Sequence, residues 1–165
     1  MYSKSGVKTI MNGSEYCRCI EGELKEMPKP LFRLVCHCKT CQDFFNQSYN
    51  DECTFLLNEC QHLDLSGIDF KGYQKGFPPI KRGKCKSCGK PSYCKVKVGP
   101  FAEFIMVPSE GLKSIEIPSP FAHIYYGSRC SDVDDDVKKI NGHYCSQAAI
   151  LLAVLKALTK RRVNA

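Results

Sequence analysis

Cys36-His37-Cys38-Lys39-Thr40-Cys41 places three thiols within six residues, and the rest of the chain is organised around this stretch. A pair of cysteines lies on either side of it, in Cys17-Arg18-Cys19 upstream and in Cys85-Lys86-Ser87-Cys88 downstream. Thiolates are soft ligands that select zinc, and zinc in proteins is almost always four-coordinate. The spacing therefore predicts a protein that binds metal through clustered cysteines.

The two outer pairs together supply one complete set of zinc ligands. Four cysteines make the closed site that is typical of a structural zinc, so removing that metal is expected to unfold the protein. Buried free thiols are the plainer interpretation, but free thiols have no reason to cluster in this way. The members of this candidate site are Cys17, Cys19, Cys85 and Cys88.

The central triplet of Cys36, Cys38 and Cys41 is then one ligand short. Three protein ligands with an open position are the pattern of a catalytic zinc, so we expect these cysteines to hold a second, reactive zinc. The triplet could also be empty or partly oxidised in the isolated protein. A fourth protein ligand would close the site instead, and the sequence offers three candidates: Cys53, Cys94 and His37.

The composition is that of an ordinary globular protein, with 43% hydrophobic and 25% charged residues in a chain of 165. This length predicts a single domain over residues 1–165. Residues 1–6 contain no apolar run and so no secretory signal. We therefore expect a cytoplasmic location, where thiols stay reduced and Cys-x-x-Cys motifs bind metal. A redox role is disfavoured because the expected α/β pattern is absent.

The charge gives only weak support for nucleic-acid binding. Four thiolates with zinc carry −2 and three carry −1, so the formal net charge of +7 falls to +4 when both sites are filled. Residues 71–90 are basic, and Tyr73 and Phe77 could stack on bases, but nucleic acid remains an unlikely partner. Six basic residues near the motifs could hold substrate carboxylates or only solvate the surface: Arg33, Lys39, Lys81, Arg82, Lys84 and Lys86.

The hydrophobic pattern predicts a mainly β fold of many short strands. The first cysteine pair is expected in an extended segment, residues 14–20, where positions i and i+2 point to one side. Gly89 follows the last clustered cysteine and is expected to adopt a positive φ in a tight turn. A short helix is expected within residues 43–51. The other expected strands are residues 31–35, 53–57, 63–70, 92–98, 104–107, 113–117 and 121–126.

A helix is expected at residues 146–161, where the apolar period becomes that of a helix. Ile150 and Val154 widen its apolar face. The apolar run is too short to cross a membrane, so we expect no membrane contact. The helix should instead pack on the sheet or on a second copy of the chain, as in a homodimer. Its central apolar residues are Ala148, Leu151, Leu152, Leu155 and Leu158.

The remaining candidate residues receive structural interpretations. The acidic run at 132–136 fails the EF-hand template and is expected to be a solvated turn. His123 lies in an apolar stretch and should be a core residue with satisfied hydrogen bonds, whereas His37 should point away from a metal held by its neighbours. Five cysteines are expected to be small buried hydrophobes: Cys53, Cys60, Cys94, Cys130 and Cys145.

Three motifs in this order resemble the glutathione-dependent formaldehyde-activating enzyme family, which includes centromere protein V-like proteins. The family pattern is Cys-x-Cys, then Cys-His-Cys-x-x-Cys, then Cys-x-x-Cys-Gly, found here at residues 17–19, 36–41 and 85–89. The resemblance covers about residues 13–125. It implies a β-tent fold with that core, followed by a C-terminal extension that contains the helix at 146–161.

The resemblance also implies a structural zinc on the outer four cysteines and a second zinc on the triplet. There the family binds the thiol of glutathione and handles S-hydroxymethylglutathione, its adduct with formaldehyde. The implied activity is that of a zinc-dependent carbon–sulfur lyase-type enzyme, with a small-molecule thiol as partner and glutathione as co-substrate. The alternative is a non-catalytic zinc scaffold that binds protein or nucleic acid.

The chain departs from the family pattern at four positions. Glu15 and Ile20 stand where family members often have glycine, Gln42 stands in place of an arginine, and Lys84 in place of a phenylalanine. None of these departures removes a ligand. They bear on how glutathione would be held.

Overall fold

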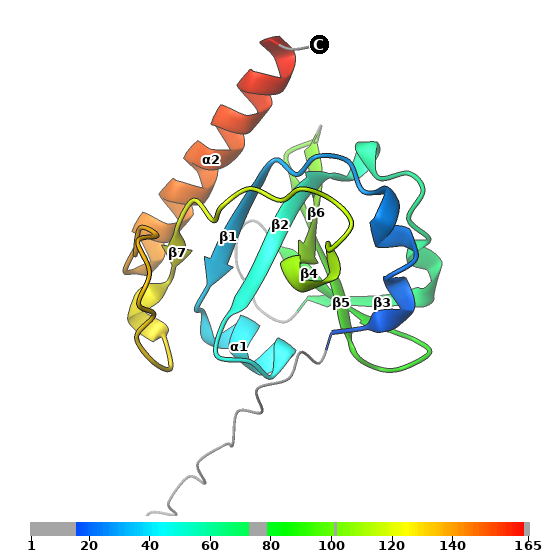
Figure 1. The fold of residues 1–165 in the computed structure, drawn as a ribbon, viewed down its shortest axis with the longest axis horizontal. Helices are drawn as coiled ribbons and strands as arrows, with labels where there is room; N and C mark the ends of the chain where they lie inside the picture. Colours follow the sequence, from blue (N-terminus) through cyan, green and yellow to red (C-terminus); the bar gives the residue numbers. More distant parts are fainter. Residues whose placement is uncertain (1–15, 73–78, 101, 164–165) are drawn as a thin grey trace, which may run out of the picture.

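A curved, seven-stranded sheet forms the centre of the fold in the computed structural model, which describes residues 16–72, 79–100 and 102–163 (Figure 1). The order is β3-β4-β5-β6-β2-β1-β7, and neighbours are antiparallel except for β7, which runs parallel to β1. The strands are β1 (Phe32–Cys36), β2 (Asn50–Leu56), β3 (Ile68–Gly72), β4 (Ile80–Cys85), β5 (Pro91–Val98), β6 (Ala102–Pro108) and β7 (His123–Ile124).

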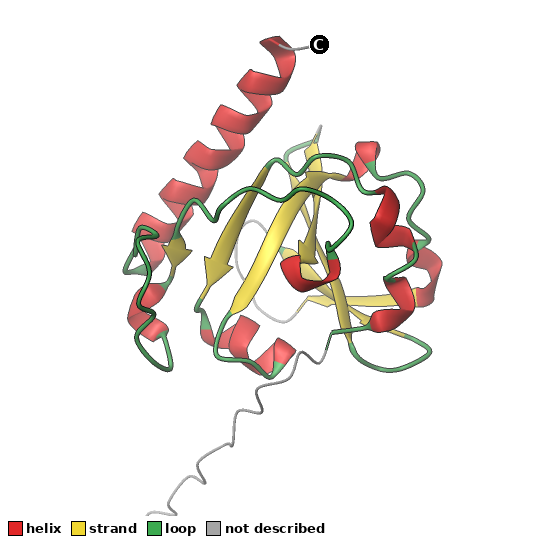
Figure 2. Ribbon diagram, in the orientation of Figure 1, coloured by secondary structure: helices red, strands yellow, loops and turns green. Residues whose placement is uncertain are grey.

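Within the described residues, two α-helices and several single turns of 3-10 helix surround the sheet (Figure 2). The α-helices are α1 (Lys39–Phe45) and α2 (His143–Val163). The expected mainly β fold with a C-terminal helix is confirmed, whereas the more specific β-tent assignment stays a prediction. The 3-10 segments are η1 (Arg18–Ile20), η2 (Glu23–Glu26), η3 (Leu57–Glu59), η4 (Leu65–Gly67), η5 (Ser109–Gly111) and η6 (Tyr126–Ser128).

The two faces of the sheet pack against different parts of the chain, because side chains alternate along each strand. One face meets η1 and η2, which lie on the side of the sheet away from α2 (Figure 1). Its buried members include Ile20, Leu24, Phe55, Ile105 and Val107. The other face meets α1 and the inner side of α2, and its buried members include Phe32, Leu34, Phe44, Phe45 and Met106.

The pairing between β4 and β5 is irregular opposite Gly83. Arg82 pairs with Cys94 and Lys84 with Pro91, so Gly83 of β4 faces two residues of β5, Ser92 and Tyr93. A Cβ at Gly83 would lie 2.5 Å from Ile68 Cγ2 and 2.9 Å from the carbonyl oxygen of Tyr93. The strands therefore approach more closely than a side chain allows.

The helix α2 packs with a different side from the one expected. Leu151, Leu152 and Leu155 are 55%, 66% and 53% exposed. Ile150 and Val154, expected at the margin, pack against the sheet together with Ala153 and Ala157. The helix carries two apolar stripes, and the sheet covers the second one. The stripe of Leu151, Leu152 and Leu155 is open to solvent in the described structure, and the homodimer through α2 stays a prediction.

Other expected elements differ in detail. Within the segment expected to be extended, residues 14–20, residues 18–20 form a 3-10 turn instead of a strand, because the chain turns to bury Ile20 and Leu24 over the sheet. The helix expected within 43–51 begins earlier, at Lys39. Residues 113–117 form no strand, and within 121–126 the strand is limited to β7. Glu15, Tyr73 and Phe77 lie outside the described residues. Among the described residues, no helix combines the length and the apolar character needed to cross a membrane.

Candidate metal centres and pocket

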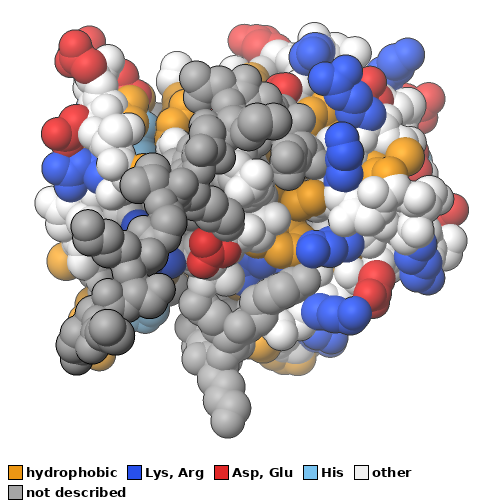
Figure 3. All heavy atoms as spheres, turned by 90° about the horizontal axis from the view of Figure 1, so that it is seen from below, with side chains coloured by type: hydrophobic (Ala, Val, Ile, Leu, Met, Phe, Trp, Pro, Cys, Tyr) orange, Lys and Arg blue, Asp and Glu red, His pale blue; other side chains and the backbone are white. Residues whose placement is uncertain are grey.

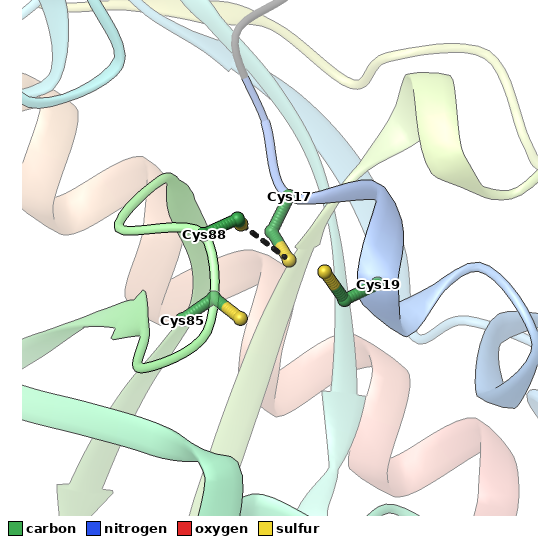
Figure 4. Close-up of side chains that lie close together, drawn as sticks. All are labelled: Cys17, Cys19, Cys85 and Cys88. Atoms are coloured by element: carbon green, nitrogen blue, oxygen red, sulfur yellow. Dashed lines mark hydrogen bonds between the residues drawn. The ribbon is translucent and has the colours of Figure 1, made fainter.

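The four outer cysteines converge where the start of the described chain meets the turn after β4 (Figure 4). Cys17 precedes η1 and Cys19 lies within it, while Cys85 ends β4 and Cys88 lies in the following turn. Their sulfurs all lie within 4.8 Å of one another, and those of Cys17 and Cys88 are 3.4 Å apart. The structure thus brings together the four residues expected to form the structural site.

Backbone geometry holds this cluster in place. The N–H of Cys17 donates to the carbonyl of Pro91 at 2.6 Å, which fixes the first segment against β5. Gly89 has a φ of 71°, as expected, and its N–H donates to the carbonyl of Cys85. The backbone N–H of Cys88 and then that of Ser87 lower the pKa of Cys85 to about 6, although burial opposes them.

The triplet forms where the chain changes from strand to helix. Cys36 ends β1, Cys38 is the N-cap of α1, and Cys41 lies in the first turn of the helix. The Cys38 sulfur accepts the backbone N–H of Cys41 at 3.4 Å, in place of the oxygen of a usual N-cap residue. All three sulfurs lie within 4.8 Å of one another.

The surroundings of the triplet favour negative charge on one of its sulfurs, that of Cys38, whereas the pKa values of Cys36 and Cys41 are raised. Hydrogen bonds with Cys36 and Cys41 lower the pKa of Cys38 to about 3. Nη2 of Arg82 lies 3.6 Å from the Cys41 sulfur, and Arg82 is only 5% exposed. Burial alone would lower the pKa of Arg82, but the charge of Cys41 and this hydrogen bond raise it. A guanidinium held in this place stabilises thiolates.

Both clusters fit zinc by the chemistry of their donors. Four sulfurs at about 2.3 Å from a zinc ion form a tetrahedron with edges of about 3.8 Å, and small side-chain movements within a 4.8 Å cluster reach that geometry. Each of the twelve cysteines lies in the described part of the chain, and none forms a disulfide. Their thiols therefore remain free to bind metal.

None of the three candidates for a fourth ligand joins the triplet within the described residues. Cys53 belongs to the opposite face of the sheet, where its sulfur lies 3.6 Å from Ser109 Oγ. Cys94 is buried, and burial raises its pKa well above the usual value. His37 is also buried and its ring turns toward His123, with 2.8 Å between His37 Nε2 and His123 Nδ1. The open position predicted for the triplet thus stays a prediction that fits the geometry.

A buried hydrogen-bonded chain lies behind the triplet. His123 Nε2 lies 2.9 Å from a carboxylate oxygen of Asp135, which extends the chain that begins at His37. His123 is thereby a satisfied core residue, as expected. The acidic run at 132–136 is largely exposed, as expected, and the Asp135 carboxylate within it also pairs with Lys139. Burial lowers the pKa of His37 to about 4, so the imidazole stays neutral.

A cavity of about 490 Å³ opens beside the triplet on the α2 face of the sheet. Its polar residues include all three cysteines together with Lys39, Glu52 and Arg82. Its remaining wall is largely apolar and comes from β1, β4, β5, β6 and α2. A concave apolar pocket with a few convergent polar groups is the usual form of a small-molecule site.

Glu52 is a pocket residue that the sequence did not reveal. It is 8% exposed, and Asn50 Nδ2 donates to its carboxylate at 2.5 Å. Burial raises the pKa of Glu52 to about 7, against the positive charge of Arg82, which lowers it. The strand expected at 53–57 actually begins at Asn50. Extending the expected strand back to residue 52 places Glu52 on the same face as Thr54. This alternation is the signal from which Glu52 could have been predicted.

The basic residues near the motifs divide into two groups. Lys39 and Arg82 line the cavity, and Lys39 also donates to the Gln42 side chain at 3.1 Å. Arg33 pairs with Asp51, and Lys86 donates to a backbone carbonyl. Gln42 is itself buried, and its amide donates to the carbonyls of His37 and Ser128 at 2.7 and 2.9 Å. Gln42 therefore anchors α1.

Two of the cysteines outside the clusters are not buried. Cys130 and Cys145 are exposed, so their assignment as buried hydrophobes is wrong, whereas Cys53, Cys60 and Cys94 are buried as expected. Both exposed cysteines follow the last core strand, where η6 and the start of α2 lie at the surface.

The face seen in Figure 3 shows Lys and Arg side chains gathered on one side, with Asp and Glu side chains among them.

The comparison with family models agrees with the geometry. The model described as "Glutathione-dependent formaldehyde-activating enzyme" matches residues 10–128, which include both cysteine clusters, Glu52 and Arg82. A search of curated proteins finds none that matches the chain. The family match spans more than half of the 165 residues and confirms the resemblance read from the three motifs. The chain belongs to the glutathione-dependent formaldehyde-activating enzyme family.

Proposed function

We propose that the protein is a zinc-dependent enzyme that makes or breaks the carbon–sulfur bond between a thiol and an aldehyde. Family membership supports a glutathione-related, formaldehyde-activating function. The observation that carries the proposal is the opening of the Cys36–Cys38–Cys41 cluster into a cavity that also contains Arg82 and Glu52. A purely structural site would have no need of that cavity. The expected cytoplasmic location would supply glutathione.

The reaction needs no oxidant. The thiol loses its proton, the sulfur attacks the carbonyl carbon, the π electrons of the carbonyl move to oxygen, and that oxygen takes a proton. The reverse sequence breaks the bond. Zinc bound at the triplet would supply a positive charge that lowers the pKa of an incoming thiol.

The residues of the chain would carry the charge and proton balance. Arg82, held against Cys41, would stabilise the negative charge that develops on the carbonyl oxygen. Glu52, whose pKa burial raises to about 7, keeps a proton near neutrality and would donate it to that oxygen. The apolar wall would exclude water from the adduct.

Zinc counting tests the proposal first. Native mass spectrometry of the wild type should give two zinc ions per chain, and Cys38→Ser should give one in a protein that remains folded. The wild type should then catalyse adduct formation from glutathione and formaldehyde, and Cys38→Ser should lose this activity. A wild-type protein with one zinc and no activity would remove the enzyme interpretation in favour of the zinc scaffold.

A further inference from the structure

The cavity beside the triplet is larger and more apolar than formaldehyde requires. Formaldehyde contributes a single carbon atom, whereas the cavity holds about 490 Å³. Glutathione is a charged tripeptide, and its carboxylates and ammonium group need polar partners. Beyond the polar group around Arg82, the sheet instead presents apolar side chains such as Ile80, Val96 and Phe104.

The helix α2 closes this apolar part of the cavity. Gln147, Ile150 and Val154 line it from the helix side. They follow one another at the spacing of a helical face, and the exposed stripe of Leu151 and Leu155 lies about a quarter turn around the helix from them. All of α2 lies beyond residue 128, where the family match ends. This chain therefore completes its cavity with a segment outside the part that matches the family.

Contacts at both ends fix α2 across the cavity. Near its start, Ser146 Oγ accepts the backbone N–H of Tyr125 at 2.8 Å, and Ser146 is fully buried. Gln147 donates to the hydroxyl of Tyr125, which also lines the cavity. Near its end, Arg161 pairs with Glu59 and donates to the carbonyl of Lys29. The helix therefore forms a fixed wall of the cavity, and its side chains can select substrates by their shape.

We propose that the cavity binds the apolar chain of an aldehyde larger than formaldehyde, and that Ile150 and Val154 determine this specificity. The proposal rests on the proposed function, because it places the reacting carbon at the triplet and the rest of the aldehyde against α2. The bond that forms joins the thiol sulfur to the carbonyl carbon, and the proton balance is the same as for formaldehyde. An apolar chain of several carbons contacts the part of the cavity wall that a one-carbon substrate leaves uncovered.

Stable thioethers test the binding without requiring turnover. Isothermal titration calorimetry should compare S-methylglutathione with S-hexylglutathione on the full chain. Each buried methylene strengthens binding about fourfold. Burial of about half of the five additional methylenes should therefore make the hexyl compound bind at least about thirtyfold more tightly than the methyl compound. Ile150→Asn should lose most of this gain. The matched control Leu151→Asn, next in sequence but exposed, should keep it.

An activity assay with hexanal and with formaldehyde separates the apolar-aldehyde specificity from the thiol-adduct function. Ile150→Asn should slow adduct formation with hexanal by a much larger factor than adduct formation with formaldehyde. Equal binding of the methyl and hexyl compounds would overturn the apolar-aldehyde proposal while leaving the thiol-adduct function in place. Absence of binding by both compounds and of turnover of both aldehydes would overturn the function itself.

Two controls complete the design. Circular dichroism must show that each variant is folded, and Val154→Ser replaces Ile150→Asn if that variant is not. An equal loss of the hexyl gain in Leu151→Asn would mean that the variants disturb the whole helix. That result would also overturn the assignment of specificity to the inner face.

Discussion

Glu52 is a carboxyl group that the fold holds away from water, and its titration should be visible in the stability of the protein. Its pKa is raised from 4.5 to about 7 in the folded state. The folded protein therefore keeps a proton that the unfolded chain releases. The contribution of the protonated Glu52 to the free energy of unfolding is complete below pH 4.5 and is lost as the pH rises through 7. The loss is on the order of 3 kcal/mol.

Glu52→Gln should remove this loss, because glutamine is neutral at every pH. Chemical unfolding at pH 5 and at pH 8 should show a smaller fall in the free energy of unfolding for Glu52→Gln than for the wild type. Glu116→Gln, at an exposed position, is the control and should behave as the wild type. An identical fall in the wild type and Glu52→Gln would show that the carboxyl is not the group responsible.

Thiol labelling should separate the cysteines by their surroundings. Cys53 and Cys60 are buried, and burial raises the pKa of each to about 11, so iodoacetamide at pH 8 should label them only after unfolding. Cys130 and Cys145 are exposed and should label first.

Cys19 and Cys88 are also exposed and supply the internal comparison. Metal bound to them should protect them, so their labelling should be slow in the isolated protein and fast after a chelator is added. Mass spectrometry of the labelled peptides gives these rates. Equal labelling of Cys19, Cys88, Cys130 and Cys145 before chelation would contradict a metal at the outer site.

At the scale of elements, β4 is the strand that links the two clusters. Arg82 reaches the triplet on one face, and Cys85 belongs to the outer cluster and the opposite core. Cys85 lies three residues after Arg82, so ordinary strand alternation places the two side chains on opposite faces. Gly83 lies between them and packs closely against β3 and β5. Both candidate sites therefore depend on the close packing of β4 at this position.

Gly83→Ala should disturb this arrangement. The new Cβ would lie 2.9 Å from the backbone oxygen of Tyr93, which cannot move as a side chain can. We expect a loss of about 1–3 kcal/mol in the free energy of unfolding, measured by denaturant titration. Gly67→Ala is the matched control, because a Cβ there meets nothing within 4 Å, and it should cost much less. Equal costs at the two positions would exclude the close approach as the cause.

The elements show which parts of the fold could be predicted from the sequence. Strands such as β1 and β5 are marked by local alternation, and the clustered cysteines by their spacing, so both could be predicted. The inner face of α2 could not, because the helix has apolar residues on two sides and only the sheet decides which side is covered. Glu52 and Arg82 lie on strands β2 and β4, and the structure, through the order β4-β5-β6-β2, determines that they share a cavity.

At the scale of the whole molecule, the outer cluster joins the beginning of the described chain to the β4–β5 turn. A structural zinc contributes about 10–16 kcal/mol in small peptides, which is comparable to the about 5–15 kcal/mol of net stability of a typical domain. Removal of zinc should therefore abolish the cooperative thermal transition. Cys85→Ser should have the same effect, whereas Cys38→Ser should retain a cooperative transition. A chelated protein that still melts cooperatively would contradict the structural role.

The order of the ligands along the chain bears on how the protein is made. The triplet lies within six consecutive residues, whereas the outer cluster needs residues from both ends of a long loop that contains the triplet. During synthesis, the ribosome releases the whole triplet well before Cys85 and Cys88 emerge. If both clusters take zinc, the local one can capture an ion on an unfolded nascent chain, while the outer one must wait for the loop to close. The first ion would then complete the reactive site, and the second would stabilise the fold around it.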